Sequence, residues 1–158
     1  MIARNQDVLA SAQSLAPLDD GMREFGAAET AKVDLAPYRI SARETAIRVR
    51  VEVPRTCNGW CALCYSTEWL VLLRVVGEQL VPILVAPMRD SVFTAHCEEG
   101  SGGEGQIERT LELAGTSTGG FRDLILKERA ARTETRSLRF RWNGTAYTLR
   151  EPWPALNL

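Results

Sequence analysis

The sequence predicts an all-β fold, mainly an antiparallel meander arranged as a sandwich or an open barrel, with a short, partly helical N-terminal segment. Three observations lead to this prediction. Several segments alternate apolar and polar residues with a period of two, two dipeptides mark tight hairpins, and no helical pattern separates the expected strands. Such a pattern favours consecutive antiparallel strands over any βαβ architecture.

Length and composition favour one domain. The chain has 158 residues, of which 45% are hydrophobic and 25% charged, both ordinary values for a globular protein. We expect residues 1–32 to be a lead-in, partly helical or mobile, and residues 33–158 to be a single β domain. The helical expectation depends on Leu9, Ala12, Leu15 and Ala16, which recur at roughly helical spacing before Pro17 breaks the pattern.

Charge and hydropathy exclude two classes of partner. The formal net charge is −1, whereas nucleic-acid binding usually requires a strongly basic domain. The longest apolar stretch, "WLVLLRVV", is too short to span a membrane. No sequence feature indicates the oligomeric state.

The first expected strands follow residue 38. In "ETAIRVRVEV", Thr45, Ile47, Val49, Val51 and Val53 share one face, and Arg48, Arg50 and Glu52 share the wet face with Glu44 and Ala46. Residues 68–76 and 79–86 should then form a hairpin, because Gly77-Glu78 suits a type II′ turn. Pro82 has no amide hydrogen, so the second of these strands should lie at an edge or carry a bulge.

The remaining expected strands follow a glycine-rich connection. "GSGGEG" matches GxGxxG, but an alternating segment follows it instead of a helix, so we expect a flexible loop without a phosphate. Ile107, Leu111 and Leu113 should share a face, and "FRDLILKE" should form the next strand. Asn143-Gly144 predicts a two-residue hairpin that pairs Trp142 with Thr145, Phe140 with Tyr147 and Leu138 with Leu149. This turn also explains the glycosylation sequon Asn143-Gly144-Thr145.

Four cysteines are the strongest chemical signal. Cys57, Cys61 and Cys64 lie in "CNGWCALCY", and Cys97 follows a later strand. An even number of cysteines in loops favours two disulfides, and we prefer Cys61–Cys64 with Cys57–Cys97 among the three possible connectivities. The alternative is a structural zinc site formed by Cys57, Cys61 and Cys64 with Cys97 or His96. The C-x3-C-x2-C spacing also resembles the cluster loop of radical S-adenosylmethionine enzymes, but nothing nearby predicts the βα units of their barrel.

No residue pattern identifies a catalytic centre. His96 is the single histidine and follows a strand directly before Cys97. Side chains of adjacent strand residues diverge, so His96 is a poor partner for that thiol. We therefore expect no catalytic residue and no cofactor apart from the zinc alternative. A hydrolase that uses His96 with an acidic residue remains a second alternative.

Two features favour a protein-binding role. Trp60 and Tyr65 lie in or beside the cysteine loop, where an exposed aromatic side chain makes a good interface anchor. Arg139, Arg141 and Arg150 share the polar side of the last hairpin, and Arg48 and Arg50 extend this set if they lie nearby. Such an arginine stripe would suit an acidic protein partner.

Three segments together resemble a loose group of uncharacterised bacterial envelope proteins: "DLAPYRISARETAIRVRV", "GGFRDLILKE" and "LRFRWNGTAYTL". The resemblance covers about residues 34–150 and implies a β-rich periplasmic or secreted protein without assigned chemistry. The first residues do not form a signal peptide, so a cytoplasmic location is the alternative. The resulting expectation is a non-enzymatic binding module, for example an immunity or inhibitor protein. A zinc-stabilised cytosolic domain is its alternative.

Overall fold

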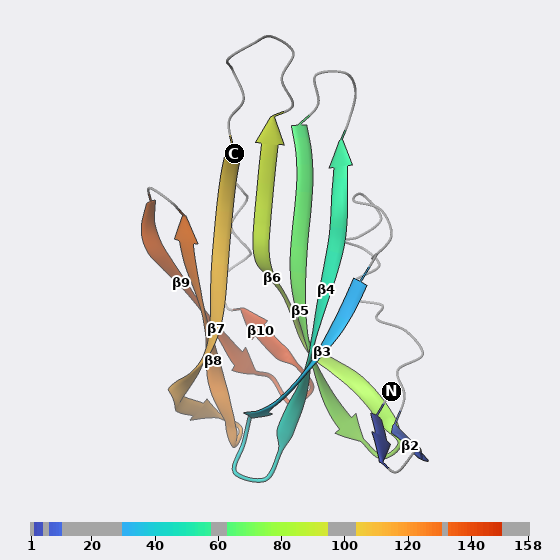
Figure 1. The fold of residues 1–158 in the computed structure, drawn as a ribbon. Coiled ribbons are helices and arrows are strands. Elements are labelled where there is room, and N and C mark those ends of the chain that lie inside the picture. The colour runs from blue at the N-terminus through green and yellow to red at the C-terminus, as the bar shows by residue number, and fades with distance from the viewer. Residues whose placement is uncertain are drawn as a thin grey trace.

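The computed structural model describes residues 2–4, 7–10, 30–57, 63–94, 104–130 and 133–149. Within these residues the regular structure consists of strands alone, which confirms the all-β prediction (Figure 1). The strands are β1 (Ile2–Arg4), β2 (Asp7–Ala10), β3 (Thr30–Arg39), β4 (Thr45–Cys57), β5 (Leu63–Val76), β6 (Gln79–Thr94), β7 (Glu104–Thr118), β8 (Phe121–Ala130), β9 (Thr133–Trp142) and β10 (Tyr147–Leu149).

Eight of these strands form one antiparallel sheet in the order β10-β9-β8-β7-β6-β5-β4-β3. Each strand pairs with its neighbours in the sequence, so the sheet is the expected meander (Figure 1). Strands β1 and β2 form a separate two-stranded sheet. Leu9, which belonged to the expected helix, lies in β2, whereas Ala12, Leu15 and Ala16 lie outside the described residues.

The sheet divides into two layers because β6 and β7 pair over a short segment. Their ladder pairs residues 89–93 of β6 with residues 104–108 of β7. Outside this segment β6 pairs with β5 and β7 pairs with β8. A bridge between Ser41 and Phe121 reconnects the two layers at the other end. There the amide of Arg122 donates a 2.7 Å hydrogen bond to the carbonyl of Ile40. The result is a sandwich of β3–β6 against β7–β10.

The main core lies between these layers and has contributions from both. Its buried members from β8, β9 and β10 face those from β3, from the corner after β3 and from β4, β5 and β6. They are Tyr38, Ile40, Ala46, Leu70, Leu72, Ile83, Leu84, Ala86, Met88, Leu124, Leu126, Phe140, Trp142 and Tyr147. Burial of this many apolar side chains is the dominant stabilising contribution to the fold.

Strand β5 is buried on both faces. Val71 and Leu73 point away from the main core and form a second cluster with Val49, Val51 and Leu80. Residues 70–73 are therefore all buried, which explains why "WLVLLRVV" shows no apolar–polar alternation. On β4, Val49, Val51 and Val53 are buried as expected, but Ala46, expected on the wet face, is also buried because it faces the other layer.

Arg74 connects the two layers through a charged and aromatic contact. Its guanidinium donates hydrogen bonds of 2.5 and 2.8 Å to the carboxylate of Glu44. The same group lies 5.3 Å from the ring centroid of Phe121 and 5.7 Å from that of Trp142. The two rings stack with their centroids 4.2 Å apart. A cation held over aromatic faces in this way gains electrostatic attraction in addition to the ion pair.

The turns follow the glycine signals. Gly77 has a φ of 60° between β5 and β6, as the first position of a primed hairpin turn requires. Gly119 and Gly120 have φ values of 59° and 83° between β7 and β8. Pro82 lies beside a register shift at which Leu72 pairs with Leu84 and Leu73 with Pro82. The expected bulge is therefore present, whereas β6 is an interior strand of the sheet and not an edge strand. Pro82 itself lies outside the segment of β6 that pairs with β7.

The register predicted for the last hairpin is wrong by one step of two residues. Trp142 pairs with Tyr147, and Phe140 pairs with Leu149, so residues 143–146 form the connection. The amide of Asn143 donates to the carbonyl of Ala146, and its Oδ1 accepts hydrogen bonds from the amides of Thr145 and Ala146. This side chain closes a longer loop than Asn-Gly alone implies. The shift is even, so the same side chains still face the core.

Candidate functional site

The structure describes only some of the predicted site residues in and around the cysteine loop. Cys57 ends β4, and Cys64 and Tyr65 lie in β5. Trp60, Cys61, His96, Cys97 and Arg150 lie outside the described residues. The predictions for the cysteine loop, for its disulfides and for its role in binding therefore stay predictions.

Arg139 and Arg141 lie on β9, on the face of the sheet that points away from the main core. Arg141 pairs with Thr148 of β10, so the two share the polar face as predicted, although the predicted register set Thr148 opposite Arg139. Arg48 and Arg50 do not join them as neighbours, because β4 is separated from β9 by strands β5 to β8 in the sheet order.

The buried carboxylate of Asp123 lies close enough to these two arginines to respond to their charge. Burial by itself raises the pKa of Asp123, but hydrogen bonds from Thr116 and Thr118 and the charges of Arg141 and Arg139 outweigh it and lower the pKa. The two hydroxyls donate to Oδ2 and Oδ1 at 2.6 and 2.7 Å. Arg139 and Arg141 therefore lie near a buried negative charge.

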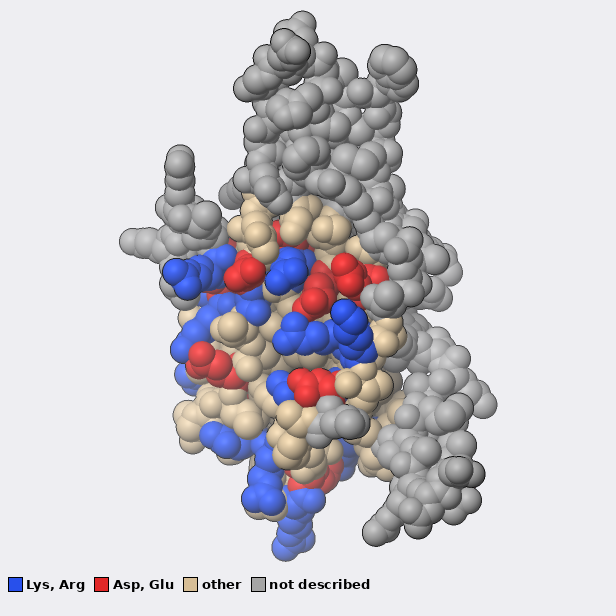
Figure 2. Space-filling model, viewed as in Figure 1, with Lys and Arg blue, Asp and Glu red and all other residues tan. Residues whose placement is uncertain are grey.

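A row of charged residues crosses five strands at one level of the sheet. The register places each member directly opposite the next, and directly opposite residues of antiparallel strands point to the same face. From β4 to β8 the row is Glu52, Glu68, Arg89, Glu108 and Arg129. Figure 2 shows basic and acidic residues interspersed over this face.

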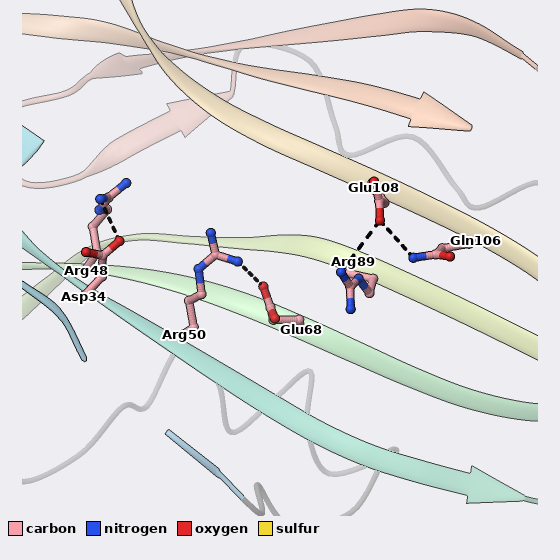
Figure 3. Close-up of polar contacts among 7 residues, drawn as sticks. All are labelled: Asp34, Arg48, Arg50, Glu68, Arg89, Gln106 and Glu108. Atoms are coloured by element: carbon pink, nitrogen blue, oxygen red, sulfur yellow. Dashed lines mark hydrogen bonds and ion pairs between the residues drawn. The ribbon is translucent and has the colours of Figure 1, made fainter. Parts of the chain in front are cut away.

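Ion pairs lie within the row and beside it (Figure 3). Arg50 donates to Glu68 at 2.6 Å, and Arg89 lies 3.6 Å from Glu108. The side chains of Arg89 and Glu108 are 53% and 58% exposed. Arg48 pairs with Asp34 at 2.6 Å nearer the sheet edge. Lys127 and Glu112 form a further 2.6 Å pair between β7 and β8.

This surface, which we call the charged face, comprises the row Glu52–Glu68–Arg89–Glu108–Arg129 together with Arg139 and Arg141. Exposed ion pairs contribute between zero and about 1 kcal/mol each, because water competes for both partners. They can therefore exchange their partners for those of another protein at little energetic cost. The charged face can provide electrostatic complementarity, which chiefly determines specificity and association rate.

Sequence reasoning missed the charged group that lies beneath this surface. Arg109 lies on the same side of β7 as Ile107, Leu111 and Leu113 and is 5% exposed. It forms ion pairs with Asp90 and Glu128. The signal was available, because a charged residue on the apolar side of an alternating strand must find a buried partner.

The described residues contain no group of three histidine, cysteine, aspartate or glutamate residues that could hold a metal ion. This does not test the zinc alternative, since Cys61, His96 and Cys97 are not among them. In the same part of the chain, no helix is long and apolar enough to cross a membrane.

Comparison with known proteins adds no family. No family model matches the chain, and neither the curated proteins nor the solved structures contain a match.

Proposed function

We propose that this chain is a non-enzymatic module that binds another protein through the charged face, in the manner of an immunity or inhibitor protein. The observation that carries the proposal is the charged row across five strands. A sheet held together on both of its sides by apolar clusters offers a rigid platform, so a partner would meet pre-positioned side chains.

The partner is a protein with an acidic patch. Arg129, Arg139 and Arg141 lie on the adjacent strands β8 and β9 and would contact that patch. Arginine suits this role because its planar guanidinium can bind a carboxylate through two hydrogen bonds. The mixed charges of the rest of the row, in which Arg89 lies between Glu68 and Glu108, would fix the register of the partner and disfavour wrong partners through like-charge contacts.

The bacterial envelope is the proposed location. It is supported by the resemblance of three sequence segments to envelope proteins and by the even number of cysteines, which suits an oxidising compartment.

The test uses charge reversal on matched surface arginines. The immobilised chain is exposed to an envelope extract of the source organism, and a retained protein is purified and its affinity measured by titration calorimetry. Arg139→Glu should weaken binding at least about tenfold, because one lost charged contact costs about 1.4 kcal/mol or more. Raising the salt concentration should weaken the wild-type complex in the same direction.

Arg43→Glu is the matched control. Arg43 is exposed in the connection between β3 and β4 and lies outside the charged face. Its reversal changes net charge by the same amount and should leave the affinity unchanged. A partner that binds both variants equally, or the absence of any partner at micromolar concentration, would contradict the proposal.

A further inference from the structure

The backbone register places two of the four cysteines directly opposite each other. Cys57 is the last residue of β4, and its partner across the ladder to β5 is Cys64. The neighbouring pair is Thr56 with Tyr65, so the alignment continues over successive residues. We infer that Cys57 and Cys64 form a cross-strand disulfide at the tip of the β4–β5 hairpin.

Ladder geometry satisfies the distance that a disulfide requires. Directly opposite residues of an antiparallel pair have Cα atoms about 4.5–5.5 Å apart. Disulfide-bonded cysteines have Cα separations of about 4.4–6.8 Å. Opposite residues also lie on the same face of the sheet, so this register needs no movement of the backbone to bring the two positions together.

The end of β4 is the part of this strand that a covalent link would restrain most. The described ladder between β3 and β4 ends at Glu52, so beyond that residue β4 is paired with β5 alone among the described strands. Cys64, in contrast, is also paired with Phe93 of β6. A Cys57–Cys64 disulfide would link the end of β4 to β5, an interior strand of the sheet, and it would close the connection that carries Trp60.

This assignment differs from the pairing that the sequence favoured. Among the three connectivities that the sequence allows, the preferred one joins Cys61 to Cys64 and leaves Cys57 for Cys97. The register between β4 and β5 instead pairs Cys57 with Cys64. Cys61 and Cys97 are then the two remaining cysteines. The inference does not depend on the proposed binding function.

The oxidation is a balanced thiol–disulfide exchange. With glutathione disulfide as the oxidant, the thiolate of one cysteine attacks it and releases one glutathione thiol. The second cysteine then attacks the mixed disulfide and releases the other glutathione thiol. One disulfide is reduced to two thiols, while two protein thiols are oxidised to one disulfide.

Peptide mapping of the unmodified full chain is the direct test. Free thiols are blocked with iodoacetamide, and the chain is digested with chymotrypsin without reduction. Cleavage after Trp60 and Leu63 separates Cys57, Cys61 and Cys64 onto three peptides, so mass spectrometry can distinguish the connectivities. The expected product joins the Cys57 peptide to the Cys64 peptide. A Cys61–Cys64 or Cys57–Cys97 link would overturn the inference, and so would four unlinked thiols after equilibration with glutathione disulfide.

Matched double variants measure the preference. Cys61→Ser/Cys97→Ser retains the inferred pair, whereas Cys57→Ser/Cys97→Ser retains Cys61 with Cys64. In glutathione redox buffers the inferred pair should have an oxidation equilibrium constant at least about tenfold larger than the control pair. An equal or smaller constant would contradict the inference. One zinc ion per chain, in protein purified without chelator, would also contradict it by assigning the thiolates to a metal.

Discussion

The guanidinium of Arg109 donates a 2.5 Å hydrogen bond to the carboxylate of Asp90, across the segment in which β6 and β7 pair. A second hydrogen bond of 2.9 Å joins Arg109 to Glu128 of β8. The arginine side chain is 1% exposed, and the two acidic side chains are 14% and 23% exposed. One buried cation therefore connects three strands where the two layers of the sandwich meet.

Arg109→Ala should lower the free energy of unfolding by about 3 kcal/mol, because it leaves two largely buried carboxylates without their shared cation. The measurement is urea unfolding followed by circular dichroism. Arg89→Ala is the control, since Arg89 pairs with Glu108 across the same two strands but is 53% exposed. Its loss should cost below about 1 kcal/mol. If Arg109→Ala and Arg89→Ala lowered the free energy of unfolding by similar amounts, burial of the Arg109 ion pairs would not explain their contribution.

Asp123→Asn should destabilise the protein near neutral pH and have little effect in acid. Threonine hydroxyls and two arginines lower the pKa of Asp123 below its ordinary value of 3.8, in spite of its burial. A carboxylate whose pKa is lower in the folded state stabilises the fold above the unfolded-state pKa. That contribution is lost as the pH falls through the folded-state pKa. Hydrogen bonds to a charged acceptor suggest a cost of about 1.5–3 kcal/mol near neutral pH.

Unfolding of wild-type and variant chains at neutral pH and well below pH 3.8 measures this dependence on Asp123. Glu112→Gln serves as the control, because Glu112 is 49% exposed and its ion pair with Lys127 is on the surface. It should change stability by below about 1 kcal/mol at either pH. A stability difference for Asp123→Asn that persists undiminished in acid would show that the carboxylate charge is not its cause.

Tyr147→Phe and Tyr38→Phe should differ, although both rings belong to the main core. The Tyr147 hydroxyl donates a 2.9 Å hydrogen bond to the carbonyl of Arg122, so its removal should cost about 1 kcal/mol. The buried Tyr38 hydroxyl finds no hydrogen-bond partner among the described residues. Its removal should be neutral or stabilising, because folding then no longer buries an unpaired polar group. Urea unfolding of both variants gives the comparison.

Alkaline pH provides a second measurement on these tyrosines. Burial chiefly raises the pKa of each to about 12. A raised folded-state pKa means that the unfolded chain ionises first, so stability present below the ordinary value of 10.0 is lost as the pH rises towards 12. Each Phe variant should reduce this alkaline loss. An ultraviolet titration in which both phenols ionise near pH 10 in the folded protein would contradict these pKa values.

Local sequence signals identified most of the strands because their causes are local. The alternation around Val49 and Val51 reflects one buried face of β4, and Gly77 marks a turn that needs a positive φ. The register of the last hairpin was not predictable in the same way. It depends on three hydrogen bonds accepted by Asn143 Oδ1 and on the contact between Trp142 and Tyr147, whose ring centroids are 5.4 Å apart.

The sequence by itself determined the fold class, the order of the strands along the meander and the polar side of β9. Each of these depends on side-chain period or turn chemistry within a few residues. Tertiary structure alone decided how the sheet divides between β6 and β7, why both faces of β5 are buried, and which charges meet on the charged face. Those features depend on the register between strands, which places residues distant in the sequence, such as Glu52 and Arg129, in one row across the sheet.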